Sequence, residues 1–312
     1  MGTDELLEKA VETTDLANGG LLNNQQTDRF IDLVVDQAEM LREARVVRMR
    51  APVMELDKIA TTGRVSQLKS EGVAPTTLAA PAFSKVTLSS VEVITPFEIT
   101  FEALEDSIEQ GNLEETIIEA MSRQTATDLE ELAIQGDTGS SDAFLVGLNG
   151  WHKLALGGGH EVDLAGAALS QAGLGAMYKA LPDQYKRNQG ELRFYFAPSG
   201  VQEWHDSFAD RPTPLGDVTL ASGVAPPYMG VPMVSVPLIP AGLAAVAPYA
   251  GTGSYSYGLL TPRDNLIFGI HRRVRVDRDR DVMRGVNIYV ISTRIAVAFE
   301  NADAVVVGVN VG

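Results

Sequence analysis

The chain has 312 residues, of which 45% are hydrophobic, and a formal net charge of −16. This length and composition predict a globular protein of one or two domains with a real core, and the charge argues against tight sequence-independent binding to nucleic acid, which depends on clustered Lys and Arg. The absence of cysteine excludes disulfides and thiolate metal sites, so stability must come from packing or from assembly.

The N-terminal stretch is acidic and lacks the basic start and apolar run of a secretory signal. Asn18-Gly19-Gly20 interrupts it, and residues 27–49 have the pattern of an amphipathic helix that turns into a strand. The end of this stretch is basic and includes Arg48. Two interpretations stay open for it: a solvated helix face, or an arm that contacts a partner.

Residues 51–56 and 86–95 alternate like strands on either side of a polar middle that is rich in Gly and Ala. This pattern predicts a long β-hairpin. An isolated two-stranded hairpin is only marginally stable in water, so this ribbon needs a neighbour.

A long helix is predicted to start near Asn112, where Glu115 completes a capping-box pattern, and to end at Gly136. It would be about 35 Å long. Before it, Thr100 is placed to cap a short helix. The long helix carries an apolar stripe, and its charged residues are expected to lie outside that stripe. Those charged residues are Glu114, Glu115, Glu119, Arg123, Asp128, Glu130 and Glu131.

Residues 137–162 are rich in Gly and Ser and predict loops at a domain boundary. An α/β region follows. Prolines interrupt its most apolar stretch, residues 231–250, which therefore does not have the pattern of a membrane helix. The expected elements are a helix over 164–181, a strand over 192–197, a helix over 201–208, strands over 231–238 and 266–276, and a pair of apolar strands within 286–311.

Asp137-Thr138-Gly139 matches the signature around an aspartic-protease carboxylate. That chemistry needs two carboxylates that share one proton. The chain has no second Asp-Thr-Gly or Asp-Ser-Gly, and this one follows a helix and not an apolar strand. We interpret it as a polar loop, with an aspartic-type hydrolase using Asp137 as the weaker alternative.

Other motifs that bear on chemistry are sparse. His160-Glu161 with Asp163 is the one local group of metal-ligand residue types, and a surface loop is the favoured interpretation because proximity in sequence does not establish convergent geometry. Two Gly-rich segments, 157–159 and 251–258, lack the spacing of phosphate-binding fingerprints. The sequence therefore predicts no catalytic residue, no cofactor and no metal.

A basic cluster between Arg272 and Arg284 is interleaved with Asp277, Asp279 and Asp281. Alternating signs favour ion pairs between subunits over phosphate binding. The residues predicted to make intersubunit contacts are Arg48, Lys69, Glu71, Arg272, Arg273 and Arg275.

The order of these parts resembles the major capsid protein of tailed bacteriophages, the Hong Kong 97-type fold, over nearly the whole chain. The match lies in the concatenation of segments and not in one motif. The segments are Asn18-Gly-Gly-Leu-Leu22 with the helix to Arg48 (the N-terminal arm), residues 52–95 with Ser70-Glu71-Gly72 (the extended E-loop), Phe97 to Ser107 and Leu113 to Asp137 (the approach to the spine helix and that helix), Gly147 to Gly150 (the glycine loop after it), Phe194 to Ser199 and Met229 to Val234 (axial-domain strands), and the final strands (the peripheral sheet).

The resemblance implies an α+β fold that contains an N-terminal arm, an extended β-hairpin E-loop, a peripheral domain with a long spine helix, and an axial α/β domain. The corresponding segments are the arm at 1–50, the E-loop at 51–96, the peripheral domain at 97–162, the axial domain at 163–285 and the C-terminal strands of the peripheral domain at 286–312.

It also implies a structural function without catalysis. Subunits form hexamers and pentamers that tile an icosahedral shell around double-stranded DNA, without sequence-specific binding and without a membrane. The implied partners are other copies of the chain and scaffolding, portal and decoration proteins, in a virion assembled in the host cytoplasm. The alternative is an encapsulin-like nanocompartment shell that packages protein cargo.

Some members of this family join their subunits through Lys–Asn isopeptide bonds that a glutamate promotes. Lys58, Lys69 and Lys85 are the candidate lysines, and Asn287 is the candidate acceptor. The strand after Asn287 offers Arg294 as its interior charge, so we predict no such cross-link. Because the chain begins almost at the arm, a separate scaffold or an already processed form is expected.

Overall fold

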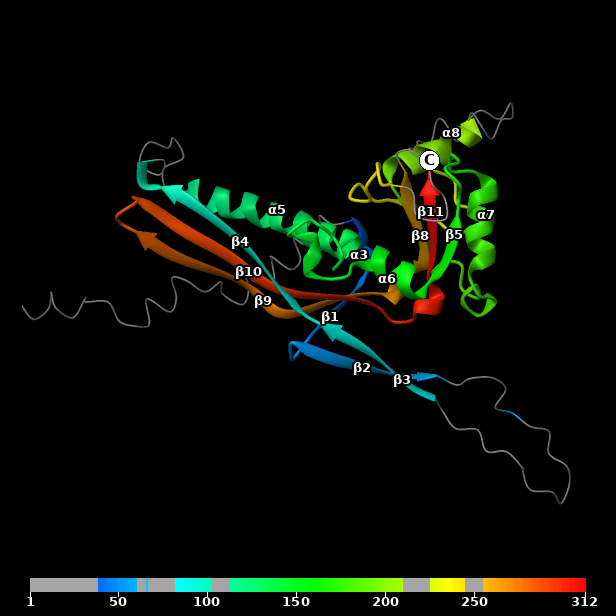
Figure 1. Ribbon diagram of the computed structural model, residues 1–312, viewed down its shortest axis with the longest axis horizontal. Coiled ribbons are helices and arrows are strands. Elements are labelled where there is room, and N and C mark those ends of the chain that lie inside the picture. The colour runs from blue at the N-terminus through cyan, green and yellow to red at the C-terminus, as the bar shows by residue number, and fades with distance from the viewer. Residues whose placement is uncertain (1–38, 61–65, 67–81, 103–112, 210–224, 245–254) are drawn as a thin grey trace, which may run out of the picture.

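A computed structural model describes residues 39–60, 66, 82–102, 113–209, 225–244 and 255–312. Two sheets lie side by side along the length of the molecule, and a thin ribbon projects away from them (Figure 1). The fold mixes helices and strands, as the sequence predicted.

The sheet that we call the long sheet has the strand order β1-β9-β10-β4. Its strands are β1 (Arg45–Arg48), β9 (Leu266–Asp281), β10 (Val286–Phe299) and β4 (Val91–Thr100). β9 and β10 form an antiparallel hairpin, β4 pairs antiparallel with β10, and β1 pairs parallel with β9. At the hairpin turn, the Asp281 carboxylate accepts hydrogen bonds from the backbone of Met283 and Arg284, and Gly285 takes a positive φ of 67°.

The predicted long helix is confirmed as α5 (Leu113–Gln135), which lies along one face of the long sheet (Figure 1). On β4, Val93 and Ile99 are buried while the alternate residues are exposed, which is the pattern of a sheet covered on one face. Gly136 ends the helix as predicted. A Cβ at this position would lie 2.5 Å from the carbonyl oxygen of Leu148, so only glycine fits here.

The sheet that we call the compact sheet has the strand order β5-β11-β8-β6-β7. Its core strand β11 (Val306–Val311) is buried at every residue. Helices α7 (Gln171–Ala180) and α8 (Pro198–Ala209) pack against the compact sheet. Trp204 of α8 lies in the hydrophobic core between these helices and the sheet. The remaining strands are β5 (His160–Asp163), β8 (Ser256–Pro262), β6 (Leu192–Phe196) and β7 (Met233–Ser235).

Helix α6 (Trp151–Gly158) connects the two sheets. Trp151 is fully buried, and its indole N–H donates to the carbonyl of Ala298 on β10. The next residue, His152, stacks on Tyr257 of the compact sheet with ring centroids 3.7 Å apart. The prediction of loops throughout 137–162 is therefore wrong for α6 and β5. Glycines at the end of α6 obscured a helix that burial of its apolar residues stabilises.

The predicted hairpin is confirmed as β2 (Val53–Ala60) paired antiparallel with β3 (Ala82–Ser89). The expectation of a single strand over 86–95 is wrong, because the chain breaks at Ser90 and β4 continues in the long sheet. Ser90 donates to the carbonyl of Pro52 through both its backbone N–H and its hydroxyl. These two bonds hold the junction between the ribbon and the long sheet.

Near the N-terminus, a short helix α3 (Glu39–Glu43) leads directly into β1. This confirms the predicted change from helix to strand for the part of residues 27–49 that the structure describes. Residues 27–38 and most of the short helix expected after Thr100 lie outside the described residues.

Further along the chain, several boundaries differ from the prediction. Helix α7 starts only at Gln171 and not at residue 164. Ala165 and Gly166 adopt positive φ values, which a right-handed helix does not accommodate. The strand expected over 231–238 is limited to β7, between Pro232 and Pro237, which cannot donate backbone hydrogen bonds. β9, by contrast, extends beyond 276 to Asp281.

The two final strands exist as predicted, but they do not pair with each other. β10 belongs to the long sheet and β11 to the compact sheet. β5, within the predicted segment 97–162, lies in the compact sheet, and β9, within the predicted segment 163–285, lies in the long sheet. The peripheral and axial divisions of the chain remain a proposal, and the sheets favour placing β5 and β11 with the axial part and β9 with the peripheral part.

Candidate assembly surfaces

The ribbon β2–β3 is anchored at its base and exposed beyond it. Leu88 is fully buried and packs with Met49 of the chain after β1 and with Ala296 and Ala298 of β10. Phe83, toward the far end of β3, is 71% exposed, and Val53, beside the base of the ribbon, is 55% exposed. Large apolar side chains on a narrow ribbon have no core of their own chain to enter, which makes the ribbon a candidate contact surface.

Two lysines of the described part of the ribbon make polar contacts. Lys85 pairs with Glu55 across the strands at 2.5 Å, and the hydrogen bond to this carboxylate raises the pKa of Lys85. Lys58 donates to the carbonyl of Glu300 at 3.4 Å, which ties the ribbon to the end of β10. Exposed ion pairs contribute little to stability, so the ribbon is not held rigid by its charges.

The basic cluster of β9 meets acidic partners within the same chain. Arg272 contacts Glu92 at 2.5 Å, and Arg294 contacts the same carboxylate at 2.8 Å. The hydrogen bond from Arg294, with support from Arg272, lowers the pKa of Glu92. This triad, on β4, β9 and β10, ties three neighbouring strands of the long sheet together.

Nearer the hairpin turn, the alternating charges also pair locally. Arg275 contacts Asp277 at 2.6 Å, and Arg284 contacts Glu98 at 2.7 Å. Arg278 reaches Glu114 of α5 at 3.1 Å. The charged residues of this cluster thus form ion pairs within the chain. A role for Arg272 and Arg275 between subunits remains a prediction.

The other predicted contact residues are less informative. Arg48 lies exposed on β1, an edge strand of the long sheet as described. Lys69 and Glu71 lie outside the described residues, and the same is true of the side chain of Arg273.

The N-terminal end of α3 is held by a carboxylate of α5 that the sequence pattern placed on the exposed face of that helix. Glu130 of α5 is only 5% exposed, and its carboxylate accepts the backbone N–H of Met40 at 2.7 Å. Burial raises the pKa of Glu130, while the backbone N–H groups of Met40 and Leu41 oppose that shift. Its helical spacing from the buried Ala126 and Ala133 was the signal available in the sequence.

Asp137 has a structural role. One of its carboxylate oxygens accepts the backbone N–H of Gly139, and the other contacts Lys153 at 2.9 Å. These contacts lower the pKa of Asp137, which keeps it ionised. The carboxylate thereby closes the loop between α5 and α6, and the described partners of its two oxygens are hydrogen-bond donors and not a second carboxylate.

The histidines are dispersed. Burial lowers the pKa of His152 to about 4, so this ring is neutral at physiological pH. The predicted surface loop around His160 is wrong, because His160 lies on strand β5, and Asp163 accepts hydrogen bonds from Ala165 and Asn310. Among the described residues, no group of three or more His, Cys, Asp or Glu is arranged to hold a metal ion.

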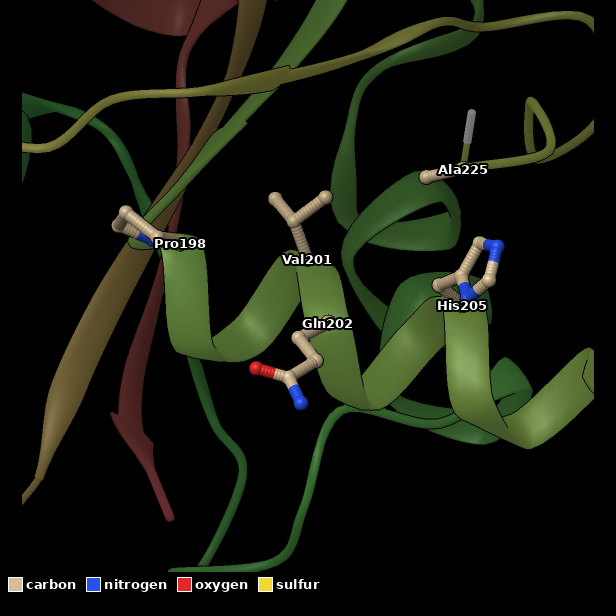
Figure 2. A pocket seen from close by; sticks show the side chains of 5 residues that line it. All are labelled: Pro198, Val201, Gln202, His205 and Ala225. Atoms are coloured by element: carbon tan, nitrogen blue, oxygen red, sulfur yellow. The ribbon is translucent and has the colours of Figure 1, made fainter. Parts of the chain in front are cut away.

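A shallow pocket of about 280 Å³ lies on α8. Figure 2 shows its lining: four residues of the helix, with Ala225 on the segment beside them. The helix residues are Pro198, Val201, Gln202 and His205. The pocket is open, and the residues that line it bring together no set of groups suited to catalysis.

The sequence pattern of the phage capsid family matches residues 18–310. The chain belongs to the phage capsid family. It is 37% identical over 313 residues to the putative prophage capsid protein YqbE of Bacillus subtilis strain 168, covering 98% of this chain and 97% of that protein. Proteins of this family are structural capsid proteins, so the chain is not an enzyme, and the hydrolase interpretation of Asp137 is abandoned.

Solved capsid structures share the fold. A chain of the satellite phage P4 procapsid that includes the size determination (Sid) protein matches with a TM-score of 0.68 at 14% identity, covering 99% of this chain and 98% of that one. The capsid of a native GTA particle matches with a TM-score of 0.64 at 18% identity, covering 88% and 91%. The Hong Kong 97-type fold predicted from the order of elements is confirmed.

No helix in the described part of the chain is both long enough and apolar enough to span a membrane.

Proposed function

We propose that this chain is the major structural subunit of an icosahedral shell, in which hexamers and pentamers enclose double-stranded DNA. Membership of the phage capsid family over nearly the whole chain carries this proposal. The exposed ribbon supports it, since Phe83 and Val53 lie where a neighbouring copy can cover them. Head-to-tail contacts of this kind close rings, because different patches of each subunit meet.

The acidic charge of the chain suits a shell that holds DNA without binding it tightly. A net charge of −16 per subunit gives little electrostatic attraction for phosphate. Scaffolding, portal and decoration proteins are the further partners of this proposal, with assembly in the host cytoplasm and the virion as the final location.

The test is to express the chain with and without the candidate scaffold of its own genome and to examine the product by negative-stain microscopy and sedimentation. Closed shells, tubes or capsomers are expected. A 33.4 kDa monomer at micromolar concentration under all these conditions would contradict the proposal. Particles filled with protein cargo and free of nuclease-protected DNA would favour a nanocompartment instead.

A further inference from the structure

The tight turn that precedes β7 in the chain has Met229 at a position where methionine fits neither the turn geometry nor the core. The backbones of Tyr228 and Val231 exchange two hydrogen bonds, 3.1 and 2.9 Å long, around Met229 and Gly230. Both central residues have positive φ, 49° for Met229 and 80° for Gly230. This is a two-residue type I′ turn, in which Asn, Asp or Gly is strongly preferred at the first central position.

Methionine at this position costs stability. A residue with a Cβ in the left-handed region is disfavoured, and Met lacks the short polar side chain with which Asn compensates locally. Nor does the side chain recover that cost in the core, since Met229 is 56% exposed. By contrast, Ala165 and Asn310, which also have positive φ, belong to a polar network around Asp163.

The turn stands on a rigid base. Tyr228 packs edge-on against both Phe194 and Trp204, with ring centroids 6.3 and 6.0 Å apart. The indole N–H of Trp204 donates to the carbonyl of Pro226 at 2.8 Å, and Val231 is fully buried. Met229 is therefore presented at a defined place, which lowers the entropic cost of any contact that it makes.

The position of the turn indicates how a neighbour can approach. It immediately precedes β7, an edge strand of the compact sheet among the described strands. Pro232 and Pro237 flank this strand and lack backbone N–H groups, which discourages a neighbour from simply extending the sheet. A contact at this edge must therefore rely on side chains.

We propose that Met229 is an apolar contact residue between copies of this chain, held in a strained turn because assembly, and not folding, uses it. A second copy is the occupant because the family builds its shells from copies of one chain, so this inference rests on the proposed function. Strain that persists at an exposed apolar residue is typical of a functional position.

The experiment compares the wild-type chain with Met229→Asn and with Met229→Leu as the matched control. Asn suits the left-handed turn and removes the apolar group, whereas Leu retains both the strain and the apolar surface. Two quantities are measured: the unfolding temperature of the unassembled subunit, and the protein concentration at which half of the subunits sediment as particles. Both are recorded at low and at high salt.

Met229→Asn is expected to unfold about 2 °C higher than wild type. It should nevertheless need about a fivefold higher concentration to assemble, in low and high salt alike, because the lost contact is apolar. Met229→Leu should assemble within about twofold of wild type.

Met229→Asn assembling at the wild-type concentration, or losing assembly only as much as Met229→Leu does, would overturn the inference and leave the shell function intact. An unfolding temperature at or below that of wild type would show that the turn is unstrained and would also overturn it. If the wild-type chain itself forms no particles, the proposed function fails, and this inference fails with it.

Discussion

The compact sheet and the ribbon show two different ways in which this chain uses apolar side chains. In β11 every residue is buried, and the strand lies between β5 and β8 in its sheet. In β2–β3, Phe83 and Val53 face solvent, and Lys85 and Glu55 form an exposed ion pair across the two strands. The first arrangement stabilises one subunit. The second contributes little to a single subunit, and under the proposed function its apolar side chains are covered by another copy.

The same contrast divides the long sheet. Its α5 face is apolar around Val93 and Ile291, whereas β9 carries charged pairs such as Arg275 with Asp277 toward its turn. We therefore predict that folding and assembly depend on different residues and that each can be perturbed separately.

The largest expected effect comes from removing the outer ribbon. Replacing residues 60–84 by a short Gly-Ser turn should leave a soluble, cooperative, helical subunit, because a surface loop adds little to the core and its closure entropy changes slowly with length. Shells should be lost completely, as judged by negative-stain microscopy. Normal shells from the shortened chain would show that the ribbon makes no essential contact between subunits, and failure to fold would show that it belongs to the core.

The next effect concerns the junction of the two sheets at His152. Burial lowers its pKa from 6.5 to about 4, so the unfolded chain binds a proton at a higher pH than the folded chain does. The contribution of His152 to stability is therefore fully present above pH 6.5 and is lost as the pH falls toward 4, by up to about 3 kcal/mol.

This slope is measured by denaturant unfolding of the unassembled subunit between pH 4 and 7. His152→Phe retains a ring to stack on Tyr257 and should reduce the slope over this range. An unchanged slope in His152→Phe would assign the pH dependence to other groups.

A smaller effect is expected at the N-terminal end of α3. Glu130→Ala removes the acceptor from buried backbone N–H groups and should destabilise the subunit by about 2 kcal/mol. Glu130→Gln retains an oxygen acceptor and should cost much less. Because the folded-state pKa of Glu130 is raised, its charged form costs stability as the pH rises above 4.5, and Glu130→Gln should flatten that dependence. Equal unfolding free energies for the Ala and Gln variants would argue against the capping role.

Charge reversal at the basic cluster should affect folding least. Arg275→Glu should change the unfolding free energy by less than about 1 kcal/mol, because its ion pair is exposed. If Arg275 also contacts a neighbour, assembly should weaken at low salt and the difference should shrink as salt screens it over about 8–10 Å. Arg123→Glu, in an exposed pair on α5, is the matched control. Identical assembly of the two variants in light scattering would remove Arg275 from the interface.

We expect no covalent cross-links between subunits. Asn287 is only 4% exposed, which shields it from the lysines of another subunit. The carboxylate of Glu114 does lie nearby, however, because Glu114 and Asn287 are both next to the hydroxyl of Tyr289. Burial and Glu114 raise the pKa of this hydroxyl to about 12. Mature particles should run as single 33.4 kDa bands after boiling in denaturant. A ladder of larger bands would make Glu114→Gln the variant to test.

Local pattern determined much of the fold. The apolar stripe and Gly136 predicted α5 and its end, and the alternation on both sides of a polar middle predicted the ribbon. These features depend on neighbours three or four residues apart, or on alternate positions in one strand, so the sequence alone contains them.

Only the tertiary structure decided which strands pair and which charges are buried. Alternation identifies the buried face of a strand but does not name its partner, so the sequence did not show that the chain leaves the ribbon at Ser90 or that β10 and β11 join different sheets. Glu130 resembles its exposed acidic neighbours until Met40, 90 residues earlier in the chain, places a backbone N–H against it. Such contacts are settled by packing between distant segments, which no local pattern records.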